Sequence, residues 1–172
     1  LVLSPDDQSL AFTQQVSDTV REVFVMSLKT ENVADDQLYK PVEVSCLGFA
    51  NAVFPVWSAD NRLLAFAASQ AVGGPLGIYT ADAAGQCPVG NHQRGLVQTQ
   101  FKSLTGMAWD PNNKQIYFTS GAVYAVDAAT GTLYPALTQP TGYGPDSDPV
   151  YRPNSTSLYY LKTQHDDQTT LI

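Results

Sequence analysis

Acidic and histidine side chains gather in three places in this chain of 172 residues. Asp6 and Asp7 are adjacent carboxylates, which are candidates for general acid–base chemistry or for binding a cation. Residues 146–148 (DSD) space two carboxylates as a calcium-binding loop begins. Residues 165–167 (HDD) join a histidine to two acids, a grouping found in metal sites and catalytic dyads.

Each of these groups also has a structural explanation. Asp6 and Asp7 have counterparts in a repeat described below, which predicts a turn. Pro149 and Val150 follow the DSD group where a calcium loop needs further oxygen ligands and a glycine, so we expect a loop before a strand. His92 and the HDD group lie in polar stretches that predict solvated turns. Because a G-x-S-x-G nucleophile motif is also missing, the sequence predicts no catalytic residue, no metal ligand and no cofactor.

One pattern occurs four times without gaps, at 2–12, 56–66, 108–118 and 150–160. A large apolar residue comes first, four polar or turn-forming residues follow, and then come an aliphatic residue and, two positions later, an aromatic one. Turn residues between apolar segments that alternate with a period of two predict a β-hairpin. The positions that define the repeat are Leu3, Ser4, Pro5, Asp6 and Phe12; Trp57, Ser58 and Phe66; Trp109, Asp110 and Phe118; and Tyr151, Pro153 and Tyr160.

Further strands are predicted after the hairpins. Third strands are expected at 22–28, 77–83 and 122–128, and fourth strands at 41–47, 95–101 and 132–138. Four short strands in a unit of about 40 to 55 residues are typical of a β-propeller blade. We therefore predict an all-β fold, an antiparallel β-propeller segment of about three to four four-stranded blades. The blade units are 1–48, 49–102, 103–144 and an incomplete 145–172, all within one domain.

Three aromatic residues take equivalent places in successive units. Trp57, Trp109 and Tyr151 are expected to pack between blades, the alternative being that they stack against a ligand. The longer connections differ between units, and binding specificity is usually found in such loops. We expect partner contacts from the loops 31–40, 84–95 and 139–148.

The motif 4–6 (SPD) with 10–12 (LAF) and 23–26 (VFVM) resembles the TolB-type propeller repeat, which also occurs in prolyl-oligopeptidase-like enzymes. The later copies depart from it, with SAD, DPN and RPN in place of SPD. Because three complete blades cannot close a ring, we expect the chain to be part of a larger propeller.

The resemblance implies a non-enzymatic protein–protein interaction or assembly module, with other proteins of a bacterial cell-envelope assembly as partners and a periplasmic or extracellular location. An alternative is the substrate-gating propeller of a serine peptidase whose catalytic domain lies outside these residues. Residues 122–134 are also similar to the strand motif of quinoprotein propellers, so a quinone- or metal-dependent enzyme is a third hypothesis.

Composition excludes some partners. The net charge is −7 and the nine lysines and arginines do not cluster, which argues against nucleic acid and anionic membranes as partners. No apolar run approaches the roughly 18 residues of a membrane-spanning helix, so we expect no direct membrane span. Cys46 and Cys87 either form one disulfide or remain two thiols, because sequence separation says nothing about the geometry of a bridge.

Overall fold

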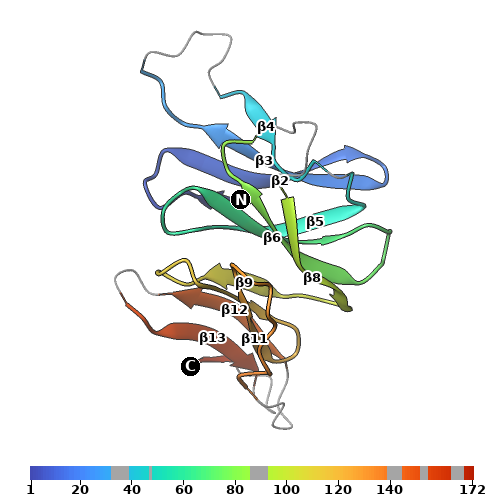
Figure 1. Ribbon diagram of the computed structural model, residues 1–172, viewed down its shortest axis with the longest axis vertical. Coiled ribbons are helices and arrows are strands. Elements are labelled where there is room, and N and C mark those ends of the chain that lie inside the picture. Colours follow the sequence, from blue (N-terminus) through green and yellow to red (C-terminus); the bar gives the residue numbers. More distant parts are fainter. Residues whose placement is uncertain (32–38, 47, 86–92, 139–144, 152–154, 164–168) are drawn as a thin grey trace.

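The computed structural model shows strands in four antiparallel sheets, and no helix occurs in the part of the chain that it describes. Figure 1 shows the four sheets stacked in chain order, from the blue first sheet at the top to the red fourth sheet at the bottom. The described residues are 1–31, 39–46, 48–85, 93–138, 145–151, 155–163 and 169–172.

Each sheet is built from strands that follow one another in the chain. The first sheet contains β1 (Val2–Leu3), β2 (Ser9–Ser17), β3 (Val20–Ser27) and β4 (Pro41–Glu43). The second contains β5 (Asn51–Trp57), β6 (Leu63–Ser69), β7 (Leu76–Asp82) and β8 (Gln93–Phe101). The third contains β9 (Gly106–Trp109), β10 (Gln115–Thr119) and β11 (Val123–Asp127), and the fourth contains β12 (Asp146–Tyr151), β13 (Leu158–Thr163) and β14 (Thr169–Leu171).

In the first three sheets, the turn that joins the first two strands is held by its own side chains. In the first sheet the Ser4 hydroxyl donates to Asp6 Oδ1 at 2.6 Å and accepts the N–H of Ser9 at 3.0 Å. Ser58 makes the same two contacts in the second sheet, to Asp60 at 2.6 Å and from Leu63 at 2.9 Å. The sequence forms a hairpin here because a short polar side chain at the start of the turn accepts the N–H of the residue that begins the next strand.

The last residue of each of these turns has a left-handed backbone. The φ angles are 58° at Asp7, 62° at Asn61 and 58° at Asn113. Asp and Asn tolerate this conformation better than most residues because their short polar side chains bond locally. The hairpin therefore forms with Asp or Asn, without a glycine, at this position.

The fourth strand predicted at 132–138 does not form as a regular strand, and this prediction was wrong. The segment still follows β11, because Tyr134 N–H donates to Ala125 O and Leu137 N–H to Val123 O, both close to 2.9 Å. Between these residues stands Pro135, which has no N–H to donate to a ladder. The third sheet therefore has three strands, and only an isolated bridge joins Val126 to Leu133.

Apolar side chains fill the spaces between sheets. One core cluster joins Ala11, Val23 and Val25 of the first sheet to Leu64 and Phe66 of the second. A second cluster joins the other face of the second sheet to the third sheet, and it includes the residues Ala65, Ala67, Ile78, Ile116, Phe118 and Val126. Successive residues of a strand point to opposite faces of the sheet, so Leu64 and Phe66 belong to the first cluster and Ala65 and Ala67 to the second. The stacking places the first strand of every sheet along one common side.

Candidate functional site

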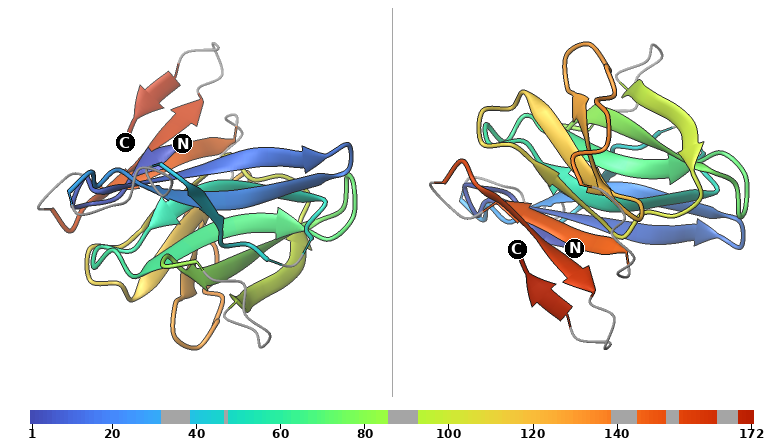
Figure 2. Two further views of the ribbon diagram at one scale, coloured as in Figure 1. Left: turned by 90° about the horizontal axis from the view of Figure 1, so that it is seen from above. Right: turned by 90° about the horizontal axis from the view of Figure 1, so that it is seen from below.

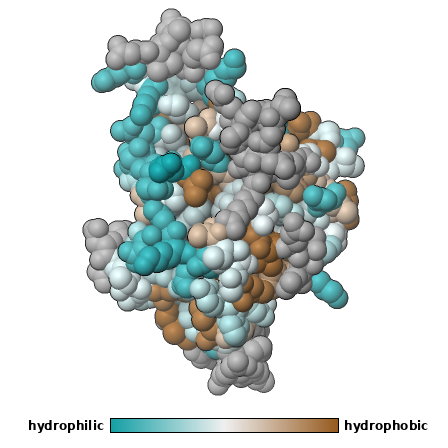
Figure 3. Space-filling view, in the orientation of Figure 1, coloured by the Kyte–Doolittle hydropathy of each residue, from teal (hydrophilic) through white to brown (hydrophobic). Residues whose placement is uncertain are grey.

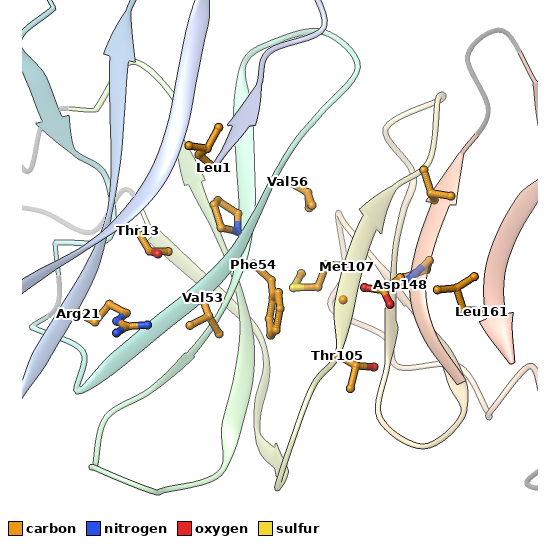
Figure 4. A pocket seen from close by; sticks show the side chains of 14 residues that line it. Leu1, Thr13, Arg21, Val53, Phe54, Val56, Thr105, Met107, Asp148 and Leu161 are labelled. Atoms are coloured by element: carbon orange, nitrogen blue, oxygen red, sulfur yellow. The ribbon is translucent and has the colours of Figure 1, made fainter. Parts of the chain in front are cut away.

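A pocket of about 760 Å³ lies along β5, β9 and β12, and Leu1, Thr13 and Arg21 of the first sheet complete its wall. Figure 4 shows Phe54 of β5 and Met107 of β9 near its middle, with Arg21 of β3 on the left and Asp148 of β12 on the right. Most of the wall is apolar. The complete lining is Leu1, Thr13, Arg21, Val53, Phe54, Pro55, Val56, Thr105, Gly106, Met107, Asp148, Pro149, Val150 and Leu161.

Two β-bulges shape this wall. The register of β5 shifts between Val53 and Val56, and that of β12 shifts between Ser147 and Val150. In each bulge a residue before proline has a positive φ, 56° at Phe54 and 50° at Asp148. A bulky residue such as phenylalanine rarely adopts this conformation, and such strained residues cluster at binding sites.

Gly106 lets the two bulged regions approach each other. A Cβ atom at this position would lie 2.8 Å from Pro149 Cδ and 3.0 Å from Asp148 Cα. These distances are too short for a real side chain, so β9 meets the bulge of β12 closely only because residue 106 is glycine. Gly106, Asp148 and Pro149 all line the pocket.

The pocket has two charged side chains, Arg21 and Asp148. The Arg21 guanidinium lies 3.4 Å from Gln15 Oε1 and donates to it, and its backbone N–H donates to Phe49 O. Asp148 is exposed. The pocket therefore offers a cation on the first sheet and an anion on the fourth, with apolar surface between them.

The DSD group lies within β12, so the predicted loop before the strand was wrong. Asp146 is 2% exposed, its Oδ1 lies 3.8 Å from Lys162 Nζ and its Oδ2 accepts the Thr138 hydroxyl. A buried carboxylate is stable only when it is paired in this way. Asp146 therefore serves to join segments of the third and fourth sheets, and it does not point into the pocket with Asp148.

Several known structures have a similar fold. The chain superposes on a putative TolB from Agrobacterium tumefaciens with a TM-score of 0.69 and 16% identity, covering 95% of this chain and 53% of that one. A puromycin-hydrolyzing peptidase of Mycobacterium tuberculosis gives a TM-score of 0.65 at 18% identity, covering 98% of this chain and 26% of that one. The chain has a TolB-like β-propeller fold.

A chain of a nidogen/laminin complex is also similar to this propeller, with a TM-score of 0.61 and 13% identity, covering 95% of this chain and 60% of that one. This chain spans about half or less of the TolB and peptidase structures, so the similarity extends to a part of each. No family model and no curated protein matches the sequence. The sheets described above are the blades of the propeller, and the pocket lies along their inner strands.

The acidic pair at the first turn of the propeller serves the hairpin. Hydrogen bonds from the Ser4 hydroxyl and from the Gln8 N–H lower the pKa of Asp6, which keeps its carboxylate ionised. A hydrogen bond from Ser58 lowers the pKa of Asp60 in the same way. In the third blade Asp110 accepts the N–H groups of Lys114 and Gln115. A lowered pKa makes Asp6 and Asp60 poorly suited to proton transfer near neutral pH, and all three carboxylates accept hydrogen bonds within their own turns.

The repeated aromatic residues lie between blades. Trp57 and Trp109 are 8% and 6% exposed and belong to the two core clusters. Tyr151 meets the ring of Tyr117 edge-on, with centroids 5.7 Å apart, and burial, followed by the hydrogen bond with Tyr117, raises its pKa. None of the three lines the pocket.

The aromatic positions that end the aliphatic–aromatic motif lie on the blade faces. Phe66 and Phe118 are fully buried, whereas Phe12 and Tyr160 are half-buried. Pro5 is exposed at the first turn and Leu3 is 49% exposed. Pro153 falls outside the described residues.

Other predicted positions also fall outside the described residues. These are His92, His165–Asp167, Cys87 and most of the three loops from which partner contacts are expected. Cys46 is described and is disulfide-bonded. Among the described residues no group of three or more His, Cys, Asp or Glu side chains could hold a metal ion, and no helix is long and apolar enough to cross a membrane.

The pocket itself was not predicted from the sequence. The sequence nevertheless carries a signal for it. Residues 54–57 (FPVW) and 148–151 (DPVY) follow the same pattern, in which the first residue varies and is followed by proline, valine and an aromatic residue. Proline within a strand indicates an edge strand or a bulge, because it cannot donate a ladder hydrogen bond. Pro55 and Pro149 stand on edge strands, next to the residues where the register shifts.

Proposed function

We propose that this chain is a non-enzymatic protein–protein interaction module, and that the pocket along its inner strands binds a segment of a partner protein. The observation that carries the proposal is the pocket wall, which combines apolar side chains with one arginine and one aspartate. Thr13 and Thr105 are the hydroxyl-bearing residues among the described lining residues, and that lining includes no histidine that could act as a base for either hydroxyl. A concave apolar surface with a few polar groups is suited to binding.

The surface and the similar structures support the same proposal. Figure 3 shows hydrophilic surface down the left side of one face and hydrophobic groups in separate patches, mainly in its lower part and along its right edge. The similar structures include TolB proteins and a chain of a nidogen/laminin complex. By analogy with TolB, the partners would be subunits of a bacterial envelope assembly, in the periplasm or outside the cell. The disulfide at Cys46 agrees with an oxidising compartment.

A binding experiment tests the pocket. Phe54→Asp places a charge in the middle of the wall, and Val72→Asp places the same charge on an exposed loop outside the pocket. Affinity purification from the producing cells should recover a partner with the wild type and with Val72→Asp, and at least about tenfold less of it with Phe54→Asp, because burying a phenylalanine contributes about 1.5–3 kcal/mol. Circular dichroism checks that each variant is folded.

A second variant separates binding from backbone strain. Phe54→Gly removes the ring but relieves the positive φ, so it should lose the partner while unfolding at the same temperature as the wild type or a higher one. Equal recovery of the partner with all variants would contradict a binding role for this pocket.

The substrate-gating propeller of a serine peptidase is a second candidate function. It is favoured by the similarity to the puromycin-hydrolyzing peptidase and to a prolyl endopeptidase, of which this chain covers 26% and 24%. A serine-reactive fluorophosphonate probe on the protein as it occurs in its cells decides between the two. Under the first proposal the protein stays unlabelled, and labelling would favour the peptidase.

A further inference from the structure

The strand edges along the pocket are unsuited to pairing with a further strand. β5, β9 and β12 each stand at one edge of their sheet, as the views in Figure 2 also show for the stacked sheets. An edge strand normally offers N–H and C=O groups on which another chain can form a ladder. Pro55 in β5 and Pro149 in β12 have no N–H, and both strands are bulged beside these prolines. A bound segment is therefore recognised by the side chains of the pocket wall.

The middle of the wall is apolar and open to a ligand. Phe54 is 37% exposed and Val150 is 51% exposed, and both line the pocket with Val56 and Met107. Figure 4 shows Phe54 and Met107 in the middle of the pocket. Apolar side chains of a partner are drawn to such a surface, because covering it removes apolar area from water.

Arg21 stands on one side of this apolar surface with an unused donor. Its Nε and Nη2 atoms donate to Gln15 Oε1, each at 3.4 Å, whereas Nη1 has no hydrogen bond within the described part of the chain. The next residue, Glu22, is buried, and its carboxylate accepts the Ser45 hydroxyl and the Phe49 N–H. A guanidinium with free N–H groups is well suited to a carboxylate, because its planar fork can bind both carboxylate oxygens.

Asp148 stands on the other side of the apolar surface. It is exposed, and Figure 4 shows it and Arg21 on opposite sides of Phe54. The single ion pair among the described residues joins Asp146 to Lys162, so Arg21 and Asp148 are paired neither with each other nor with another described side chain. Two unpaired charges of opposite sign are complementary to a ligand that carries the same two charges in the opposite places.

We propose that the pocket binds a short segment of a partner protein with an acidic residue at one end, a basic residue at the other and apolar residues between them. The acidic side chain binds the Arg21 guanidinium, the basic side chain binds the Asp148 carboxylate, and the apolar residues cover Phe54 and Met107. The inference rests on the proposed function, since it names the chemistry of the segment that the pocket binds. A segment with two acidic or two basic ends is rejected, because it leaves one charge of the pocket covered without a partner.

Selection from a peptide library tests the charge pattern. The full chain is immobilised, and short peptides of random sequence displayed on phage are selected against it. We expect the enriched peptides to carry one acidic and one basic residue that flank apolar residues. Enriched peptides without this pattern overturn the proposal.

Charge reversals identify the two contacts. Arg21→Glu should select peptides with basic residues at both ends, and Asp148→Lys should select peptides with acidic residues at both ends. A synthetic peptide enriched by the wild type, with blocked termini, should bind each variant about tenfold more weakly in isothermal titration calorimetry, because attraction at one end becomes repulsion.

Two residues outside the pocket supply matched controls. Arg62→Glu makes the same change at another exposed arginine. Asp7→Lys makes the same change at an exposed aspartate whose φ of 58° is close to the 50° of Asp148, so it matches the backbone strain as well. Both control variants should bind the peptide as tightly as the wild type does. A loss in the controls equal to that in the pocket variants would contradict the proposed contacts.

The variant Phe54→Asp separates this inference from the proposed function. If no peptide is enriched, or if the peptide binds Phe54→Asp as tightly as the wild type, the pocket is not a binding site and both proposals fail. If affinity falls with Phe54→Asp but with neither charge reversal, the pocket binds a segment and only the charge pattern is wrong. The switch of Arg21→Glu to doubly basic peptides is the decisive positive result, because a folding defect would lower binding without changing the preferred charge.

Discussion

Glu22 shows how a single side chain determines a junction between blades. It is 2% exposed, and its carboxylate accepts the Ser45 hydroxyl and, at 2.7 Å, the N–H of Phe49. Phe49 in turn inserts its ring beside Phe66 and Tyr79 of the second blade. Burial raises the pKa of Glu22, the hydrogen bonds from Ser45 and Phe49 oppose this change, and the charge of Glu43 adds to it. The carboxyl group therefore couples the junction to pH.

The stability of the protein should depend on pH through Glu22. Because the folded state binds the proton of Glu22 more tightly than the unfolded state, its contribution is full below the unfolded pKa, about 4.5, and is lost as the pH rises through the raised pKa. The measurement is urea unfolding of the wild type and of Glu22→Gln from pH 4 to pH 8. We expect the free energy of unfolding of the wild type to fall with pH relative to that of the variant.

A matched acid supplies the control for this measurement. Glu31→Gln changes an exposed carboxylate and should leave the pH profile parallel to that of the wild type. If the Glu22→Gln profile were also parallel, burial of Glu22 would not be the source of the pH dependence.

The hairpin turn is the element that repeats most faithfully in this molecule. It closes two strands with a serine or an aspartate at its start and ends on a left-handed residue, which in the second and third blades also reaches the preceding blade. One local motif thus terminates strand pairing and joins blades. This double use explains why Asn61 and Asn113 stand where a glycine would satisfy the backbone alone.

Two substitutions at Asn113 separate these two uses. Asn113→Gly keeps the backbone conformation but loses the bond from Ala59 N–H, and should cost about 0.5–1.5 kcal/mol of unfolding free energy. Asn113→Ala also places a Cβ-bearing residue without a local hydrogen bond in the left-handed region, which adds about 1–2 kcal/mol. Thermal or urea unfolding of both variants checks the order, and an alanine variant as stable as the glycine variant would contradict it.

A disulfide between Cys46 and Cys87 should join the first two blades. A Cβ at Gly85 would lie 2.7 Å from Val44 Cγ1, so the chain two residues before Cys87 touches the chain two residues before Cys46. Peptide mapping of the unreduced protein should find the two cysteines linked. Reduction, or Cys46→Ser, should lower the free energy of unfolding by about 2–4 kcal/mol. Two separate thiol peptides in the unreduced digest would contradict the bridge.

The second blade is the centre of the molecule as a whole. The first core cluster covers one of its faces and the second cluster covers the other, so all residues of β6 except Leu63 and all residues of β7 except Asp82 are buried. The first and third blades each share one of these clusters. Stability should therefore be distributed unevenly along the stack.

Hydrogen exchange should reveal this gradient. We expect the amide protons of β6 and β7 to exchange most slowly, and those of β1 and β14 to exchange by local opening, because edge strands are short and less covered. Exchange followed by mass spectrometry provides the measurement. Protection in β6 no greater than in β13 would contradict a stack that is held together through its second blade.

Much of this architecture follows from local sequence. Ser4–Asp6 and its counterparts predict the turns, and Leu10–Phe12 and its counterparts predict the strands after them, because turn chemistry and a period of two act over fewer than ten residues. The antiparallel propeller segment was predicted in this way, its TolB-like character was predicted from the resemblance of residues 4–6, 10–12 and 23–26 to that repeat, and both predictions are confirmed. The failure at 132–138 is also local in origin, since a run of apolar residues was given more weight than Pro135.

The pocket was decided by tertiary structure. Arg21, Phe54, Met107 and Asp148 come from four different blades, and no spacing along the chain shows that they line one cavity. The close approach of β9 to the bulge of β12 at Gly106 is a contact between neighbouring blades. The sequence alone therefore determined the repeated blade, whose turns and strands form through short-range contacts. Only the stacking of blades, which brings residues more than 100 positions apart onto one surface, decided where this protein offers a site.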